Sequence, residues 1–259
     1  MIPFEPVKAF LQIGPFSILP WGVMFVTGFL AAMFLIFKEA KKKGIDEKHI
    51  YIIALLILIG AIIGPRLFYI FEHLSYFLAS PGQIFELWKG GETSYGAFLG
   101  VLFVWLYVRK QRDIKFTQIL DLVAPYILLA MAITRIGCFL NWCCYGLPSS
   151  LPWAIQVPGN IPRHPTQIYE LLYSLIGFFV LLKFKNIKEK GKETKFKSLL
   201  KKPGALFFSF LMFYSFFRFL NDFLREYENY FLGLALSQWI VVVLFLFGFV
   251  MLNRPIRRR

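Results

Sequence analysis

Charge and cysteine are both scarce in this sequence. Charged residues make up 17% of its 259 residues and hydrophobic residues 58%, whereas soluble domains carry about 25% charged residues. The three cysteines, Cys138, Cys143 and Cys144, have neither a CxxC spacing nor a second paired group, which argues against a structural zinc site. Two interpretations stay open: a disulfide from Cys138 to one of the adjacent pair, or packing of three small side chains.

Acidic residues are also few, with 15 Asp and Glu against 29 Lys and Arg and a net charge of +14. Such an excess can indicate nucleic-acid binding, but these basic residues do not gather with stacking aromatics in one patch. They fall instead in alternate loops between apolar segments. The pattern argues against a nucleic-acid partner and favours topology signals that contact anionic membrane lipids.

The sequence contains many long apolar runs. About 20 apolar residues are needed to cross a membrane, and the run 50–63 has none of the polar face that a helix of a soluble protein needs. The sequence therefore predicts an all-α, polytopic membrane protein in which residues 1–259 form a single integral membrane domain. Its seven predicted spans are approximately 19–37, 50–71, 95–108, 117–141, 168–182, 205–224 and 232–252, the third and fifth being short.

The distribution of Lys and Arg orients these spans. Twenty-two of these residues follow the first, third, fifth and seventh spans, whereas the opposite loops contain four, Lys8, Lys89, Arg163 and Arg225. Cytoplasmic loops carry the excess of positive charge. We therefore expect the N-terminus outside and the C-terminus in the cytoplasm.

Three arginines, Arg66, Arg135 and Arg218, lie inside or at the end of apolar spans. A charge there is costly and normally faces a bundle interior or an aqueous cavity. At about 1.5 Å per residue, all three fall in the outer halves of their helices, where guanidiniums suit a phospholipid phosphate. The alternative is that each arginine snorkels to the interface or pairs with an acid. Nearby acids are Glu72, Glu170 and Asp222.

Polar residues accompany Arg218, and a further polar run lies at the start of the fifth span. Tyr214 and Asp222 stand four residues before and after Arg218, so a helix places all three on one face. The run 164–170, His-Pro-Thr-Gln-Ile-Tyr-Glu, precedes the fifth span. Capping of the helix by Thr166 and anchoring by Tyr169 would be a purely structural explanation, but it does not account for the His, Gln and Glu together.

Several segments together resemble a known family. They are Gly64-Pro65-Arg66-Leu67, Leu87-Trp88-Lys89-Gly90-Gly91, Tyr95-Gly96-Ala97-Phe98-Leu99-Gly100, Arg135-Ile136-Gly137, Pro152-Trp153-Ala154, the run 164–170, and Arg218 with Arg225. In this order they are similar to the prolipoprotein diacylglyceryl transferases, seven-span enzymes of the bacterial inner membrane. The resemblance covers nearly the whole chain.

The resemblance implies a reaction and its partners. The family moves the diacylglyceryl unit of phosphatidylglycerol onto the lipobox cysteine of a prolipoprotein and releases glycerol phosphate, with no soluble cofactor or metal expected. By the same resemblance, Arg135 corresponds to a phosphatidylglycerol-binding arginine and Arg218 to a second essential arginine. The predicted phospholipid-binding residues are Arg66, Arg135, Asn141, Gln167, Tyr169, Glu170, Tyr214 and Arg225.

The incoming thiol also requires a base, because its pKa is about 8.5. Tyr95 stands where the family commonly has a histidine, so Tyr95 and His164 are the predicted catalytic residues for this step, with Arg135 and Arg218 holding the leaving phosphate. Further departures from the family pattern are Trp21, Cys138, Trp142 and Cys143.

These departures leave other functions open. The chain could be a divergent member that uses another lipid or acceptor, or a non-catalytic lipid-binding protein. An anion transporter is a third alternative, because intramembrane arginines also line substrate pathways. A transporter, however, predicts inverted repeats and a site near the membrane midplane, and the sequence indicates neither.

Overall fold

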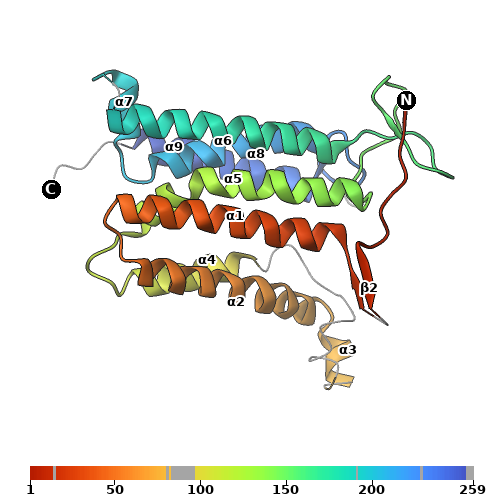
Figure 1. The fold of residues 1–259 in the computed structure, drawn as a ribbon, viewed down its shortest axis with the longest axis horizontal. Helices are drawn as coiled ribbons and strands as arrows, with labels where there is room; N and C mark the ends of the chain where they lie inside the picture. The colour runs from red at the N-terminus through yellow and green to blue at the C-terminus, as the bar shows by residue number, and fades with distance from the viewer. Residues whose placement is uncertain (14–15, 80–81, 83–96, 191, 228–229, 255–259) are drawn as a thin grey trace. The chain divides into compact units, whose positions relative to one another are not determined.

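The computed structural model describes residues 1–13, 16–79, 82, 97–190, 192–227 and 230–254. The chain divides into two compact units, one formed by Met1–Ile36 with Leu120–Arg259 and the other by Phe37–Ile119. Helices dominate both units (Figure 1). Their bounds are α1 (Pro20–Lys42), α2 (Glu47–Glu72), α3 (Leu74–Ala79), α4 (Ala97–Val108), α5 (Phe116–Leu140), α6 (Thr166–Lys190), α7 (Lys195–Leu200), α8 (Ala205–Asp222) and α9 (Leu236–Asn253).

The mostly helical membrane-protein class that the sequence predicts is confirmed. Among the described residues, four helices have the length and composition of membrane spans, namely α1, α5, α6 and α9, and a shorter apolar helix covers Leu99–Val108. The fifth predicted span, 168–182, lies within the longer helix α6. That helix continues past the apolar run because its backbone hydrogen bonds do not depend on apolar side chains. The count of seven membrane crossings stays a prediction.

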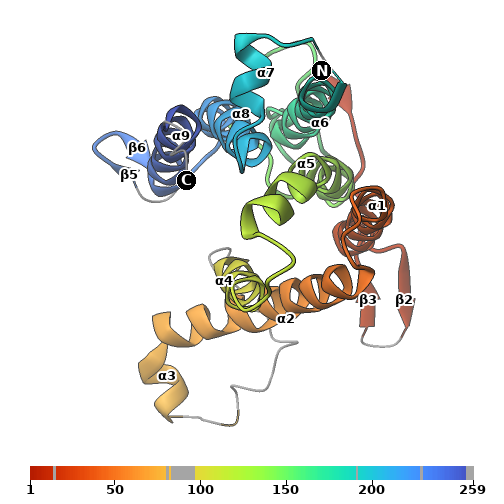
Figure 2. The ribbon, with the colours of Figure 1, turned by 90° about the vertical axis from the view of Figure 1, so that its left-hand side faces the viewer.

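In the first unit, α8 packs against both α6 and α9. Figure 1 shows α5, α6, α8 and α9 with similar axis directions, and Figure 2 views these helices end on. Gly28 allows α1 to approach α5 closely. A Cβ atom at this position would lie only 2.7 Å from the Ala130 carbonyl oxygen, so a larger residue would clash. Small residues allow membrane helices to approach in this way.

Short strands lie before α1, between α5 and α6, and between α8 and α9. β1 (Ile2–Pro3) pairs in parallel with β4 (Ile155–Gln156), in register from Ile2 to Ile155. β2 (Leu11–Ile13) and β3 (Phe16–Ile18) form an antiparallel hairpin, as do β5 (Tyr230–Phe231) and β6 (Leu234–Ala235). These strands of two or three residues are the part of the described structure that an all-α prediction omits.

The second unit is built on α2 and α4, which pack together. Asp46 caps α2 by accepting a hydrogen bond from the Lys48 N–H at 2.9 Å. His49, buried in the first turns of α2, joins the Tyr107 hydroxyl and the Asp113 carboxylate, each at 2.7 Å. Three polar side chains thus tie the start of α2 to α4 and to the segment after it.

Candidate functional site

A buried carboxylate joins two arginines at one end of the first unit. Arg135 Nη2 donates to Glu170 Oε1 at 2.7 Å, and Arg218 Nη1 donates to Glu170 Oε2 at 2.7 Å. The Glu170 side chain is 1% exposed, against 19% for Arg135 and 14% for Arg218. Each carboxylate oxygen therefore holds one guanidinium, while both guanidiniums keep some solvent-accessible surface. We call these three residues the arginine–glutamate cluster.

The members of the cluster come from three helices. Arg135 lies five residues before the last residue of α5, Glu170 four residues after the first residue of α6, and Arg218 four residues before the last residue of α8. At about 1.5 Å per residue, each lies within about 8 Å of its helix end. The cluster therefore sits where these helices meet the connecting loops.

Arg218 is held on a second side by its own helix. Its Nε lies 2.9 Å from Asp222 Oδ1, and Tyr214 OH donates to Glu170 Oε1 at 3.5 Å. The prediction that a four-residue spacing places these side chains on one face is confirmed. Tyr227, which also donates to Asp222 Oδ1 at 2.7 Å, was not predicted, because it lies beyond the helix and no periodic spacing relates it to Asp222.

The amide side chains of Asn141 and Gln167 bind backbone groups. Asn141 Oδ1 accepts a hydrogen bond from the Trp21 N–H at 2.8 Å, at the start of α1. Gln167, which is 1% exposed, donates from Nε2 to the Cys143 carbonyl oxygen at 2.6 Å. Both amides therefore hold the end of α5 and the segment after it, next to the arginine–glutamate cluster.

The Thr166 hydroxyl binds the backbone of the segment before α6. Its hydroxyl donates to the Cys144 carbonyl oxygen at 2.7 Å, and Thr166 is itself the first residue of the helix. A capping side chain belongs to the residue before the helix and accepts from an N–H group. Capping, the purely structural explanation for Thr166, is therefore not what this hydroxyl does, and Thr166 ties α6 to the segment after α5.

His164 lies before α6, beside a tyrosine. Its Nδ1 is 3.2 Å from the Tyr169 hydroxyl, and Trp153 Nε1 donates to the same hydroxyl at 2.8 Å. Burial lowers the pKa of His164 from an ordinary value of about 6.5, which keeps the imidazole neutral at pH 7. With the proton on Nδ1, that N–H donates to Tyr169 and Nε2 can accept a proton. His164 can therefore serve as a base.

Tyr95 and Arg66 are also among the predicted site residues. Tyr95 lies outside the described residues. Arg66 belongs to the unit Phe37–Ile119, is 7% exposed, and has its guanidinium 5.8 Å from the ring centroid of Tyr69 and 5.4 Å from that of Phe77. These distances are those of cation–π contacts.

The three cysteines lie at the end of α5 and just after it, and all are free thiols. Arg135 Nη1 lies 3.7 Å from Cys138 Sγ, so the cysteines adjoin the arginine–glutamate cluster. Within the described part of the chain, no group of three or more His, Cys, Asp or Glu residues is arranged to hold a metal ion.

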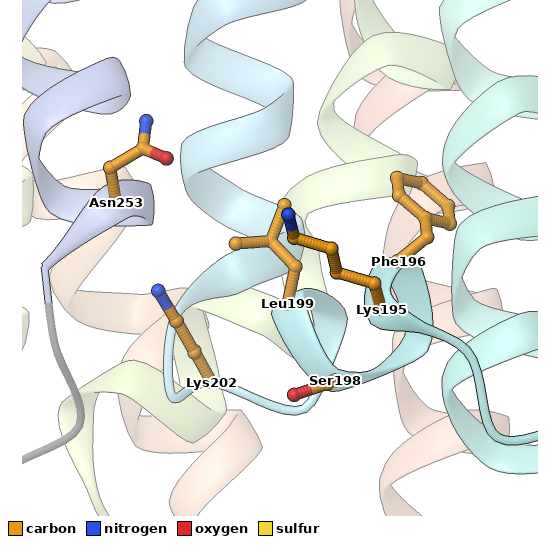
Figure 3. Close-up of a pocket in the computed structure, with 6 residues that line it drawn as sticks. All are labelled: Lys195, Phe196, Ser198, Leu199, Lys202 and Asn253. Atoms are coloured by element: carbon orange, nitrogen blue, oxygen red, sulfur yellow. The ribbon is translucent and has the colours of Figure 1, made fainter.

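A cavity of about 620 Å³ lies elsewhere in the first unit (Figure 3). Its lining residues belong to α7, the segment after α7 and the end of α9, whereas Glu170 lies at the start of α6, about 30 Å along that helix from Lys190. One lining residue, Lys202, donates to the Leu252 and Arg254 carbonyl oxygens at 2.7 and 2.9 Å. The cavity is therefore separate from the candidate site. Its lining residues are Lys195, Phe196, Ser198, Leu199, Lys202 and Asn253.

The candidate site has an excess of positive charge and unused hydrogen-bond donors. Arg135 and Arg218 are matched by Glu170 and Asp222, and Arg225, whose guanidinium lies over an aromatic ring, adds a positive charge near the end of α8. Each guanidinium has five N–H donors in a fixed plane, more than its contacts with the described residues use. The arrangement can therefore bind an anion with planar, doubly hydrogen-bonding oxygens.

Comparison with known proteins extends the resemblance along nearly the whole chain. A family model described as prolipoprotein diacylglyceryl transferase matches residues 8–254. A phosphatidylglycerol–prolipoprotein diacylglyceryl transferase from Geobacter sulfurreducens is 32% identical, over 98% of this chain and 96% of the relative. Proteins of the same name from Methylobacillus flagellatus and Bordetella avium are each 34% identical, over 98% of this chain and 98% and 96% of the relatives.

Proposed function

Because this chain belongs to the prolipoprotein diacylglyceryl transferase family, we propose that it transfers the diacylglyceryl unit of phosphatidylglycerol to a cysteine thiol of a prolipoprotein. The whole chain, residues 1–259, acts as one transferase domain in this proposal. Phosphatidylglycerol, prolipoproteins and the surrounding membrane lipids are its partners. The observation that carries the proposal is the bridge from Glu170 to Arg135 and Arg218, whose remaining donors suit a phosphodiester.

The bridge favours this reaction because it orients two guanidiniums before substrate arrives. Glu170 accepts one hydrogen bond from Arg135 and one from Arg218. Because each guanidinium is planar and held in this way, its other N–H groups keep fixed directions. In the reaction, a C–S bond forms to the glyceryl carbon while the C–O bond to phosphate breaks. The negative charge that develops on the departing glycerol phosphate is then stabilised by donors that need no rearrangement.

The thiol proton requires an acceptor, and His164 and Tyr95 are the candidates. His164 is neutral at pH 7 because burial lowers its pKa. A neutral imidazole accepts a proton more readily than the hydroxyl of a tyrosine, whose pKa is about 10. We therefore propose His164 as the stronger candidate, oriented by Tyr169.

The other predicted phospholipid-binding residues support the arginines in this proposal. Tyr214 contacts Glu170, and Asn141 and Gln167 hold the end of α5 and the segment after it, which carries Cys143. Arg225 contributes positive charge for the headgroup phosphate, and Arg66 contacts lipid from its own unit. Apolar helix surfaces accommodate the acyl chains.

We further propose seven membrane spans in the inner membrane of a bacterium, with the N-terminus outside. In the first unit, α6 carries Glu170 near its start and Lys188 and Lys190 in its last turn, and Lys201 and Lys202 precede the end of α8 that is opposite to Arg218. Positive charge favours the cytoplasmic side. The cluster would then open toward the outer leaflet, where a secreted precursor presents its cysteine.

Mass spectrometry of a lipobox peptide tests the proposal directly. The purified protein is incubated with the peptide in vesicles of phosphatidylglycerol, and we expect the mass of one diacylglyceryl group to be added at the cysteine. Vesicles of phosphatidylethanolamine and the variant Arg135→Ala serve as controls, and both should give background transfer.

The alternatives lead to other results in the same experiment. Transfer from another lipid would indicate a divergent enzyme, and full transfer by Arg135→Ala would overturn the role of the cluster. Absence of product from well-folded protein with every lipid, together with failure to complement a strain lacking the transferase, would favour lipid binding or anion transport.

A further inference from the structure

The backbone at the end of α5 brings two cysteines together. The Trp142 N–H donates to the Phe139 carbonyl oxygen at 2.9 Å, and the Cys143 N–H donates to the Cys138 carbonyl oxygen at 3.0 Å. Trp142 has a φ of +52°, in the left-handed region. Nested bonds of this kind around a left-handed residue define a Schellman motif, which commonly brings together the side chains at the positions of Cys138 and Cys143.

The thiols follow the backbone. Cys143 Sγ donates to the Cys138 carbonyl oxygen at 3.6 Å, and the thiols of Cys138, Cys143 and Cys144 all lie within hydrogen-bonding reach of one another. Cys138 is buried, whereas Cys143 is half-buried and so within reach of a reagent from solvent. The pair therefore has one thiol that an external disulfide can meet and one held beside it.

We propose that Cys138 and Cys143 are a reversible disulfide pair that exchanges with low-molecular-weight disulfides. The Cys143 thiolate attacks a disulfide of the form R–S–S–R, which gives a mixed disulfide and releases the first R–SH. The Cys138 thiolate then attacks Cys143 Sγ and displaces the second R–SH. Two thiols lose two protons and two electrons, and the external disulfide takes up both.

Oxidation of this pair reaches the arginine–glutamate cluster through two contacts. Arg135 Nη1 lies 3.7 Å from Cys138 Sγ, and the Cys143 carbonyl oxygen accepts from Gln167 in the first turn of α6, three residues before Glu170. A new S–S bond fixes the positions of both sulfurs and replaces the Cys138 thiol that Arg135 contacts with a disulfide sulfur. The oxidised protein should therefore transfer more slowly than the reduced protein, a consequence that rests on the proposed function.

Formation of the disulfide is tested without any activity measurement. The full chain in phosphatidylglycerol vesicles is equilibrated with oxidised or reduced glutathione, its free thiols are alkylated, and its peptides are mapped by mass spectrometry. We expect a Cys138–Cys143 link, with the loss of two hydrogen atoms, in oxidised glutathione and its disappearance in reduced glutathione. Three unmodified thiols in oxidised glutathione would overturn the proposal.

Cys144 is the competing thiol, because it interacts with both Cys138 and Cys143 but lies beyond the Schellman motif. The variant Cys144→Ser should form the same Cys138–Cys143 link as the parent. Loss of the link in this variant, or a link from Cys138 to Cys144 in the parent, would contradict the assignment of the pair.

The effect on transfer is tested in a second measurement on the same samples. We expect oxidation to lower the transfer rate by about tenfold, a size typical of coupling between sites, and reduction to restore it. The variant Cys143→Ser should transfer at one rate in both buffers. A mapped disulfide with an unchanged rate would overturn the link to Arg135, whereas the absence of transfer in every buffer would count against the proposed function alone.

Discussion

The same three helices are joined by a buried carboxylate at both of their ends. At one end Glu170 of α6 binds Arg135 of α5 and Arg218 of α8. At the other end Asp121 of α5 binds Lys188 of α6 at 2.8 Å, and it also accepts from backbone N–H groups at the start of α8.

The difference between these ends lies in the partners. Asp121 accepts from the Gly204 and Phe207 N–H groups at 3.2 and 3.1 Å, donors that every helix start must satisfy. The hydrogen bonds of Asp121 therefore have a structural role, because they satisfy the start of α8. Glu170 binds guanidiniums, each with further N–H groups to offer. A carboxylate between two arginines joins helices and also leaves donors for an anion, so only that end has the chemistry of a site.

The largest effect should come from removing one arginine. Arg218→Ala deletes half of the proposed phosphate contact and leaves Glu170 with one cation, so transfer should fall by about 100-fold or more. The rate of peptide lipidation measures it. Lys188→Ala removes the cation from the other carboxylate and should leave the rate of folded protein near that of the parent. Equal losses of transfer rate in the two variants would contradict the proposal that only the Glu170 end forms the site.

Neutralising the central carboxylate should have a smaller effect. Glu170→Gln keeps the side-chain size but replaces one oxygen by an N–H donor that faces a guanidinium, so one arginine loses its orientation. Transfer should fall by about tenfold or more, in line with losses on changing groups that orient binding residues. A binding assay with phosphatidylglycerol vesicles should show weaker association. Unchanged transfer would mean that the arginines need no carboxylate between them.

The pH dependence should identify the base. Since burial lowers the pKa of His164, the imidazole stays neutral below the ordinary value of about 6.5, and transfer should decrease only at pH values under that. The variant His164→Gln should be slower and should lack this acid-side decrease. A pH profile identical in shape to that of the parent would assign the base elsewhere, with Tyr95 the remaining candidate.

The same pKa shift has a consequence for stability. An unfolded chain protonates His164 at about 6.5, whereas the folded chain resists protonation, so the free energy of unfolding should decrease as the pH falls through that value. Thermal unfolding at several pH values measures this, and His164→Gln should reduce the slope.

The smallest effect on transfer should come from the other carboxylate. Asp121→Ala removes two backbone contacts and the Lys188 ion pair, which should lower the free energy of unfolding by about 2 kcal/mol. Thermal unfolding of the purified protein measures this loss. The transfer rate per folded molecule should stay close to that of the parent. A large loss of rate at full folding would show that the two ends act together.

The helices of the candidate site could be predicted from local pattern. The apolar runs around Arg135 and Arg218 were long enough to indicate helices, and the four-residue spacing placed Asp222 beside Arg218. By contrast, the contact from Tyr227 to Asp222 and the bond from Thr166 to the Cys144 carbonyl oxygen could not be predicted. Both depend on loop backbone, for which no periodicity exists.

The amino-acid sequence by itself determined the membrane-protein class, the family and the three arginines that needed a partner, because hydrophobicity, charge and motif order are local properties. Only the tertiary structure decided that Glu170, among several nearby acids, stands between Arg135 and Arg218, and that Cys143 rather than Cys144 occupies the Schellman contact with Cys138. These choices arise from the packing of α6 on α8 and from the left-handed backbone of Trp142 at the end of α5. Contacts between distant segments, and turns of this kind, depend on how helix ends meet.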